Sequence, residues 1–381
     1  MNAIFDPPSH GCSRGETVLR EGQIRIPSGC AVAGVIDRLG RRFSGEVIIR
    51  SIAAMRDRSN GLGGGFAAYG IYPHYSQWYA LHIFYDHHGA KVDCEQYLKQ
   101  HFEIADQSPI PTRHMQEITD SPLIWRYFVN PIPARLYRCG MDQREYVARS
   151  VLAVNRQIDG AYVFSSGKNM GIFKGVGYPE DIARFYRLEE YEGYCFTAHG
   201  RYPTNTPGWW GGAHPFGLLD YSVVHNGEIS SYDTNRRTIE MYGYSCTLQT
   251  DTEVIAYIVD YLHRAKGLTF DEIAQVLAPP FWQAIEEMPP EKRECAAYLR
   301  STFASLLVNG PFSIIVGFSG GLLALNDRLK LRSMVVGEKG DVVYFASEEA
   351  AIRVVEPEPD RVWAPKGGEP VIVAQAGGTE R

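Results

Sequence analysis

The stretch Ile26-Pro27-Ser28-Gly29-Cys30-Ala31-Val32-Ala33-Gly34-Val35-Ile36 places a thiol at the first position of an apolar run. Small and β-branched residues in such a run are typical of a buried strand. A polar leader, residues 1–29, precedes the thiol, and we expect it to be removed so that Cys30 becomes N-terminal. The freed α-amine, which titrates near pH ~8, would then act as the general base for the thiol. Taken alone, a cysteine in such a run is more often a core thiol than a nucleophile.

Composition restricts the class of protein. The 381 residues are 45% hydrophobic and 22% charged, as in a globular protein of one large or two ordinary domains. The net charge of -6, without a Lys/Arg run, argues against nucleic acid and anionic membranes as partners. No apolar run approaches the roughly 18 residues of a membrane span, and residues 1–29 lack the apolar segment of an export signal.

The cysteines and histidines do not indicate a metal site. The seven cysteines are scattered without a CxxC pair, which favours a reducing cytoplasm over a disulfide framework or a zinc site. His199, His214 and His225 lie near predicted strand ends, but they lack a ligand spacing such as HExxH. We therefore expect a cytoplasmic protein without bound metal, whose ligand is a small molecule or another protein.

Hydrophobic periodicity predicts a chain of mixed strands and helices. Glycines at 61–65 follow a predicted helix and precede a predicted strand. A phosphate loop needs a strand before it and a helix after it, so this order argues against a nucleotide site. Prolines indicate an insertion near 105–140, and residues 357–381 form a predicted tail that could dock on another protein. The predicted elements are a strand at 30–36, a helix at 45–56, strands at 66–72 and 75–85, helices at 91–104 and 144–158, two strands joined by a turn within 160–176, a helix at 179–191, strands at 194–199 and 221–225, helices at 233–242 and 250–261, further helices to about 307, and strands at 313–316, 322–325, 333–336 and 342–346.

Four further residues complement a thiol nucleophile. Asn226 and Gly227 end a predicted strand and offer an amide side chain and a backbone N–H to an oxyanion. Arg201 follows another predicted strand, and its guanidinium can donate two parallel hydrogen bonds to a carboxylate. Asp251 supplies the opposite charge, which suits an ammonium group. With Cys30, these residues describe a site for an α-amino acid that carries a reactive side-chain amide.

Each of these residues has a simpler interpretation. Asn226-Gly227 is also the preferred sequence of a type I′ hairpin turn. The spacing of Thr250 and Glu253 is that of a capping box, so Asp251 alone suggests a helix start. Arg201 alone suggests an exposed or ion-paired guanidinium. Only the combination of these residues, and none of them alone, indicates a catalytic site.

Five motifs follow one another along the chain, and their order is more specific than any one of them. The motifs are Cys30-Ala31-Val32-Ala33-Gly34, His199-Gly200-Arg201-Tyr202-Pro203-Thr204-Asn205-Thr206, Ala213-His214-Pro215-Phe216, His225-Asn226-Gly227-Glu228-Ile229 and Thr250-Asp251-Thr252-Glu253. In this order they resemble class II glutamine amidotransferases of the N-terminal-nucleophile hydrolase type, and among these the glutaminase region of glutamate synthase. The resemblance covers residues 30–356 apart from the proline-rich region.

The resemblance implies an α+β fold and a reaction. The fold is a four-layer αββα sandwich, in which two antiparallel sheets pack face to face with helices outside. The thiol of the first motif would attack the side-chain carbonyl of glutamine, releasing ammonia, and water would then hydrolyse the thioester to glutamate. Arg201 and Thr204 would hold the α-carboxylate, Asp251 the α-ammonium, and Asn226 with Gly227 the oxyanion.

Three departures from the family pattern bear on function. Ala31 follows the nucleophile where the family often has glycine, and 29 residues precede it. The chain also leaves no room for the flavin and iron–sulfur region of a complete glutamate synthase. We therefore expect no cofactor in this chain, and a separate synthase subunit that carries FMN and an iron–sulfur cluster and receives the ammonia. The alternatives are a non-catalytic glutamine-binding regulatory subunit and an amidase of the same fold with another substrate.

Overall fold

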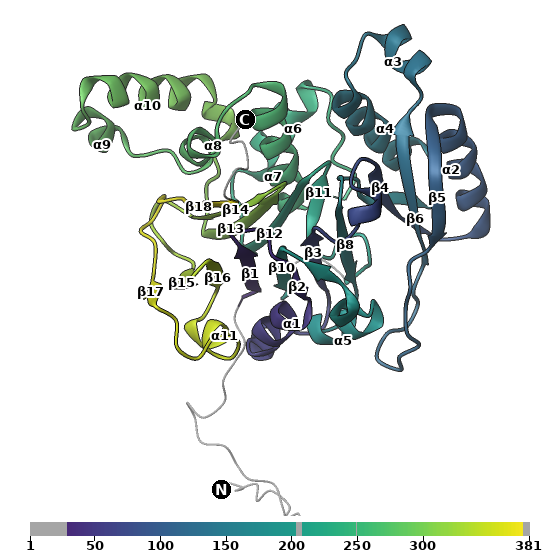
Figure 1. The fold of residues 1–381 in the computed structure, drawn as a ribbon. Coiled ribbons are helices and arrows are strands. Elements are labelled where there is room, and N and C mark those ends of the chain that lie inside the picture. The colour runs from purple at the N-terminus through teal and green to yellow at the C-terminus, as the bar shows by residue number, and fades with distance from the viewer. Residues whose placement is uncertain (1–28, 203–207, 249, 376–381) are drawn as a thin grey trace, which may run out of the picture.

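A seven-stranded antiparallel sheet forms the centre of the molecule (Figure 1). The computed structural model describes residues 29–202, 208–248 and 250–375, so the leader up to residue 28 lies outside it. The first strand, β1, lies within this sheet and is buried along its whole length. In sheet order the strands are β17 (Arg361–Trp363), β15 (Val335–Lys339), β16 (Val342–Ala346), β1 (Ala31–Asp37), β10 (Cys195–Gly200), β3 (Gly64–Tyr69) and β8 (Met170–Gly175).

A five-stranded antiparallel sheet packs against the first sheet, and β1 and β10 contact its strands β12 and β13. The apolar side chains between the sheets include Val224, Ile315 and Leu322, all fully buried. These strands are continuous apolar runs because both of their faces are covered. In sheet order they are β11 (Phe216–Leu218), β12 (Tyr221–Gly227), β13 (Phe312–Phe318), β14 (Gly321–Asn326) and β18 (Val371–Ala374).

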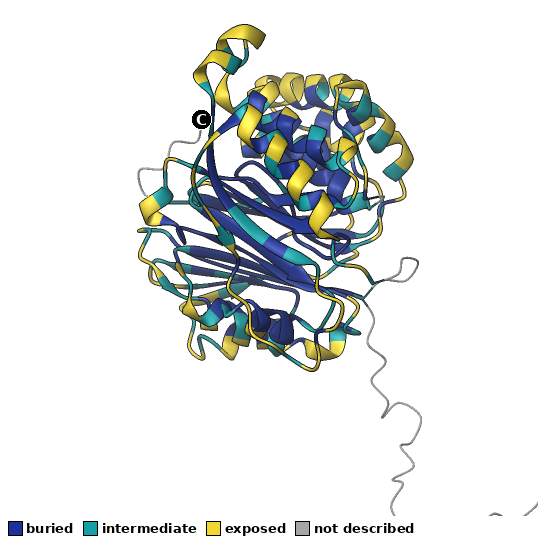
Figure 2. Cartoon of the chain, turned by 90° about the vertical axis from the view of Figure 1, so that its right-hand side faces the viewer, coloured by how far each residue is buried: buried dark blue, intermediate teal, exposed yellow. Residues whose placement is uncertain are grey.

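Helices cover the outer face of each sheet. On the seven-stranded sheet, α1 (Glu46–Ala53) contacts β1 and β10, α5 (Pro179–Phe185) contacts β3, and α11 (Glu349–Arg353) contacts β16. On the five-stranded sheet, α7 (Asp251–Asp260) contacts β11 and β12, and α6 (Tyr232–Met241) packs on α7. Figure 2 shows the buried strands between these two layers of helices. The predicted four-layer αββα sandwich is therefore confirmed.

A third sheet lies beside the sandwich, where β4 contacts β8 and β7 contacts β11 (Figure 1). The proline-rich region near 105–140 supplies part of this sheet and the short helix α3. The two strands predicted within 160–176 are present as β7 and β8, but they do not pair as a hairpin, because β7 joins the third sheet and β8 joins the seven-stranded one. The elements are β5 (Phe102–Pro109), β6 (Leu123–Pro131), β4 (Tyr79–Tyr85) and β7 (Ala161–Ser165), with α2 (His88–His101), α3 (Pro133–Cys139) and α4 (Gln143–Gln157).

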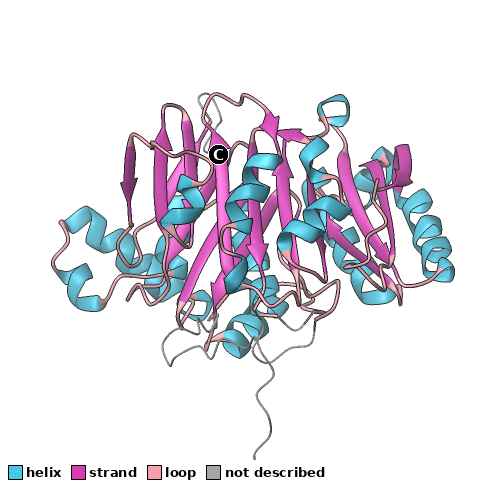
Figure 3. Cartoon of the chain, turned by 90° about the horizontal axis from the view of Figure 1, so that it is seen from below, coloured by secondary structure: helices cyan, strands magenta, loops and turns pink. Residues whose placement is uncertain are grey.

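The remaining elements include a helical arm that projects to the left in Figures 1 and 3. Its helices are α8 (Phe270–Leu277), α9 (Trp282–Glu286) and α10 (Pro290–Thr302), and a capping box of Thr269 and Glu272 begins α8. None of the described helices is long and apolar enough to cross a membrane. The short elements are β2 (Phe43–Ser44), β9 (Glu192–Gly193), η1 (Arg56–Arg58), η2 (Pro73–Tyr75), η3 (Leu188–Glu190), η4 (Tyr261–Ala265) and η5 (Ala304–Leu306).

The segment after residue 356 contributes to both sheets of the sandwich. The sequence predicted a tail with little core content, yet β17 pairs with β15 and β18 pairs with β14. Val373 of β18 is buried against β14. These strands are three and four residues long and are bordered by prolines and glycines, so they carry no strand signal of useful length. Residues 376–381 lie outside the description.

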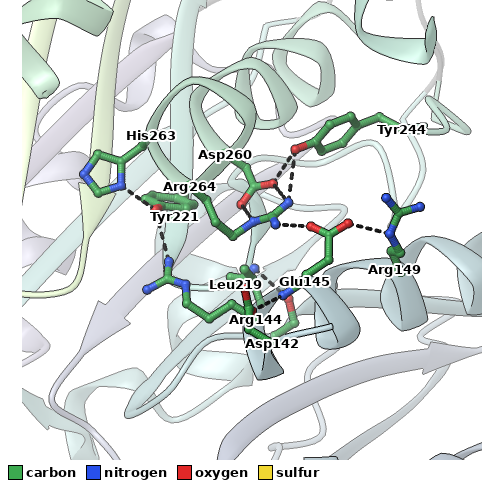
Figure 4. A network of polar contacts seen from close by, with 11 residues as sticks. Asp142, Arg144, Glu145, Arg149, Leu219, Tyr221, Tyr244, Asp260, His263 and Arg264 are labelled. Atoms are coloured by element: carbon green, nitrogen blue, oxygen red, sulfur yellow. Dashed lines mark hydrogen bonds and ion pairs between the residues drawn. The ribbon is translucent and has the colours of Figure 1, made fainter. Parts of the chain in front are cut away.

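An ionic network ties the C-terminal end of α7 to α4 (Figure 4). Asp260 is fully buried, and its carboxylate accepts hydrogen bonds from Arg264 Nε at 2.8 Å and from the Tyr244 hydroxyl at 2.6 Å. Arg264 also forms an ion pair with Glu145 of α4. Buried charges are tolerated where such partners satisfy them, and removing one partner leaves another unpaired. The network therefore fixes α7 relative to the third sheet.

Replacing Asp260 by alanine should lower the free energy of unfolding by about 3–5 kcal/mol, because Arg264 would lose its buried partner. Glu349→Ala is a matched control, since it removes another i,i+4 ion pair, that with Arg353, in which both side chains are about half exposed. The control should change stability by less than ~1 kcal/mol. Urea denaturation of both variants measures the difference, and equal losses would contradict the assigned role of the network.

Candidate functional site

Cys30 lies at the N-terminal end of β1, beside the C-terminal end of β10. The pairing of Ala31 with Gly200 sets this position, and the Tyr202 backbone N–H donates a hydrogen bond to Cys30 Sγ at 3.3 Å. Arg58 Nε donates to the Cys30 carbonyl oxygen at 3.2 Å. Burial raises the pKa of the Cys30 thiol, while the Tyr202 amide and the charge of Arg201 act in the opposite direction. The thiol is thus partly buried between charged groups rather than enclosed in an apolar core.

Arg201 directly follows β10 and is only 5% exposed, which excludes a surface guanidinium. The glycine-containing turn predicted at 59–65 holds its backbone: the Ser59 hydroxyl donates to the Arg201 carbonyl at 3.0 Å, and the Arg201 N–H donates to the Gly63 carbonyl at 2.8 Å. A Cβ on Gly63 would lie 2.9 Å from Arg201 Cδ, so glycine makes room for the arginine side chain. Burial lowers the pKa of Arg201, whereas the negative charges of Cys30 and Asp251 act to raise it.

Asn226 and Gly227 end β12 and do not form a hairpin turn, because β12 pairs with β13 and the chain continues into α6. The Asn226 side chain is fully buried, and neither its Oδ1 nor its Nδ2 has a hydrogen-bond partner among the described residues. An unpaired buried amide costs about 1–3 kcal/mol. A Cβ on Gly29 would lie 3.4 Å from Asn226 Oδ1, so this amide faces the residue before Cys30.

Asp251 is the first residue of α7, and half of the predicted capping box is present. The Thr250 hydroxyl accepts from the Glu253 N–H at 3.2 Å, but the Glu253 carboxylate binds the backbone of residues 247 and 248 instead of Thr250. Thr252 Oγ1 donates to Asp251 Oδ1 at 3.2 Å, and His225 Nδ1 lies 3.5 Å from that oxygen. Burial acts to raise the pKa of Asp251, but His225 and Thr252 outweigh it and lower this pKa. Asp251 therefore remains a carboxylate.

Three buried histidines connect β10, β12 and α7. The rings of His199 and His214 stack with centroids 4.0 Å apart, and His199 Nε2 lies 3.0 Å from the carbonyl oxygen of His225. Thr252 Oγ1 lies within hydrogen-bond distance of both His214 Nε2 and His225 Nδ1. Burial lowers the pKa of His199 to about 3 and that of His214 well below its ordinary value. In the described part of the chain, no three His, Cys, Asp or Glu side chains are placed to hold a metal ion.

Two buried ionisable side chains hold the loops next to Arg201 and Asp251. Lys174 Nζ donates to the Gly211 carbonyl at 2.9 Å, and Glu253 accepts from the Thr247 and Leu248 N–H groups at 3.1 and 2.9 Å. Burial lowers the pKa of Lys174 to about 7 and raises that of Glu253 to about 7. Lys174 could not be identified from the sequence, because only the fold brings β8 to this loop.

The structure brings most of the predicted site residues together at one end of the sandwich. The charges of Arg201 and Asp251 both act on the Cys30 thiol, and Asn226 faces the residue before it. Thr204, the other predicted carboxylate ligand, lies outside the described residues. Arg332 has no role that the sequence predicts, and its Nη1 lies 3.4 Å from the position of a Cβ on Gly29.

Comparisons with known proteins are consistent with this geometry. A sequence model of the family described as class II glutamine amidotransferases matches residues 108–367. An uncharacterized protein of Archaeoglobus fulgidus is 51% identical over 346 residues, which is 90% of this chain and 91% of that protein. A protein of Methanothermobacter thermautotrophicus named a putative glutamine amidotransferase is 27% identical, over 86% of this chain and 93% of that protein.

Solved structures also match, at low sequence identity. The glutamine phosphoribosylpyrophosphate amidotransferase of B. subtilis, complexed with ADP and GMP, is 14% identical. The match covers 91% of this chain and 47% of that chain, with a TM-score of 0.46.

Gly227→Ala should destabilise the protein more than Gly267→Ala. Both glycines have positive φ, so each substitution carries the left-handed strain of about 1–2 kcal/mol. At Gly227 the new Cβ would also overlap the Pro311 carbonyl oxygen, whereas nothing lies within 4 Å at Gly267. We expect a further loss of about 1–3 kcal/mol for Gly227→Ala in urea denaturation. Equal losses would show that the end of β12 is not packed as tightly as described.

Proposed function

Because the chain belongs to the class II glutamine amidotransferases, we propose that Cys30 is the nucleophile that releases ammonia from the side-chain amide of glutamine. One observation carries this assignment: the Cys30 thiol accepts a hydrogen bond from the residue that follows Arg201, and the buried Asn226 amide that faces Gly29 has no partner among the described residues. A nucleophile, two charged anchors and an oxyanion donor are the parts that hydrolysis of an amino-acid amide requires.

The two charged residues favour a free α-amino acid as the substrate. The guanidinium of Arg201 would bind the α-carboxylate, for which its planar pair of N–H groups is suited. Thr204 would supply a further hydrogen bond to the same group. The Asp251 carboxylate, whose pKa is lowered, would bind the α-ammonium. An amide that lacks this zwitterionic end would lose both interactions, which argues against a general amidase of the same fold.

The reaction proceeds in two steps on the proposed residues. The Cys30 thiolate attacks the side-chain carbonyl carbon, and Asn226 Nδ2 with the Gly227 N–H stabilises the resulting oxyanion. The C–N bond then breaks, and the nitrogen leaves as ammonia after accepting a proton. Water attacks the γ-glutamyl thioester, the C–S bond breaks, and glutamate is released with the thiol restored. The α-amine of Cys30 would act as the base and acid in both steps.

This use of the α-amine requires removal of residues 1–29. Gly29 supports such a step, because it has a φ of +102° and lies against both the Asn226 amide and Arg332. Its removal frees the space in front of Asn226, where the substrate carbonyl would bind. Cleavage would therefore supply the base and open the oxyanion site together.

We further propose that the ammonia passes to a separate synthase subunit of the glutamate synthase type. The order of the five sequence motifs supports this proposal. FMN and an iron–sulfur cluster would belong to that subunit, and neither is assigned to this chain. A regulatory subunit that binds glutamine without cleaving it is the remaining alternative, and ammonia release by the complex distinguishes the two.

Cys30→Ala should abolish ammonia release from glutamine, because no other group would form the thioester. Cys139→Ala is the control, since Cys139 is exposed on α3, and it should retain wild-type activity. Intact-mass spectrometry of the active wild-type protein should give a chain that begins at Cys30. Fully active protein that retains Met1 would refute the proposed role of the α-amine.

Asn226→Ala should lower kcat about 10²–10³-fold with a smaller effect on KM, because the amide acts on charge that develops in the transition state. Asp251→Asn should instead raise KM for glutamine, because the α-ammonium loses its counter-charge. Steady-state kinetics with glutamine separates the two effects. If Asn226→Ala changed KM alone, its amide would bind the substrate rather than the oxyanion.

A further inference from the structure

Exposed apolar side chains gather where the helical arm meets the turn between β14 and β15. Phe281 and Trp282, at the start of α9, are 46% and 47% exposed, and Leu329 and Leu331 in the turn are 66% and 59% exposed. Single exposed apolar residues are common, but a contiguous group marks an interaction site. With two arginines between them, these residues form the arm face, defined as Phe281, Trp282, Arg300, Arg328, Leu329 and Leu331.

The turn that presents the two leucines is an ordered structure. The Asp327 carboxylate accepts hydrogen bonds from the backbone N–H groups of Leu329, at 3.0 Å, and of Leu331, at 2.9 Å. Asn326 Nδ2 donates to the Arg332 carbonyl oxygen at 2.8 Å. The leucine side chains therefore project from a backbone that is already fixed, and a binding partner would not have to order it.

The arm face also carries positive charge on a chain whose net charge is -6. The Arg328 guanidinium lies 4.9 Å from the ring centre of Phe281, and that of Arg300 lies 4.4 Å from the ring centre of Trp282. Among the described residues their hydrogen-bond partners are neutral oxygens, the Pro280 carbonyl for Arg300 and Asn309 Oδ1 for Arg328. Burial and the charge of Arg328 lower the pKa of Arg300. This pair of like charges lacks a carboxylate partner among the described residues.

The arm face is continuous with the site along two routes. The ordered turn ends at Arg332, which lies against Gly29 and whose charge acts on the Cys30 thiol. In addition, Arg328 binds the side chain of Asn309, and the Asn309 carbonyl accepts from Ser230 N, three residues beyond Gly227. A protein bound on the arm face would therefore lie next to the point at which ammonia is released.

We propose that the arm face docks the separate chain that consumes the ammonia. The proposal rests on the proposed function, because it supplies the location of the partner in that function. The complementary surface would have an apolar centre, with carboxylates opposite Arg300 and Arg328. A second copy of this chain does not fit, because a symmetric contact centred on the arm face would bring two such arginine pairs together.

The test compares Leu329→Glu with Val92→Glu, which places the same charge at a 52% exposed apolar position on α2, within the third sheet's layer. The binding partner is the chain that co-purifies with the wild-type protein from the source cell and supports amination from glutamine together with it. Binding is measured by biolayer interferometry, and amination is measured with glutamine and, separately, with ammonium chloride. Arg300→Glu is the second variant of the arm face.

Leu329→Glu and Arg300→Glu should each raise the dissociation constant of the complex at least tenfold and lower glutamine-dependent amination in parallel. Ammonia release by the isolated variants and ammonium-dependent amination should match the wild type, and Val92→Glu should behave as the wild type throughout. Equal binding by Leu329→Glu and Val92→Glu would overturn the proposal, as would a wild-type self-dimer that Leu329→Glu dissociates. Failure of the wild type to release ammonia, alone or in the complex, would instead refute the proposed function.

Discussion

The pairing register between β1 and β10 is the constraint on which the site depends. It places Ala31 opposite Gly200, and so brings Cys30 next to Arg201 and Tyr202, the latter 172 residues further along the chain. Because side chains alternate along a strand, a slip of one residue would turn every β1 side chain to the other face. All seven residues of β1 are buried between two neighbouring strands, so the core on both faces of the sheet opposes such a slip.

A second constraint is the fixed position of α7, which carries Asp251 at its first residue. At this end, Thr252 contacts the His214 and His225 rings, and at the other end Asp260 joins the network of Figure 4. Burial keeps His199 and His214 uncharged, so they provide hydrogen bonds without adding positive charge beside Arg201. The fold therefore positions two opposite charges, Arg201 and Asp251, beside histidine rings that burial keeps neutral.

Features carried by local pattern could be predicted from the sequence, and those set by long-range pairing could not. The apolar run after Cys30 and the amphipathic pattern of α4 appear as expected. β7 and β8 pair with β4 and β3, which lie far away in the sequence. The residues of the turn between β7 and β8 carry no information about these partners. The strands β5 and β6 were missed in a proline-rich segment because their prolines lie at the strand ends, Pro109 and Pro131, where a missing N–H is tolerated.

The same division applies to the site. Cys30, Arg201, Asn226 and Asp251 follow or begin recognisable strands and a helix, so their positions could be proposed from the sequence. Lys174 and Arg332 approach the site only through the fold. The most direct test of Cys30 as the nucleophile is mass spectrometry after treatment with a glutamine analogue in which a chloromethyl ketone replaces the carboxamide, so that the thiolate displaces chloride and forms a stable thioether. We predict a single adduct on Cys30 that excess glutamine prevents; an adduct on another residue that abolishes activity, with Cys30 unmodified, would contradict this role.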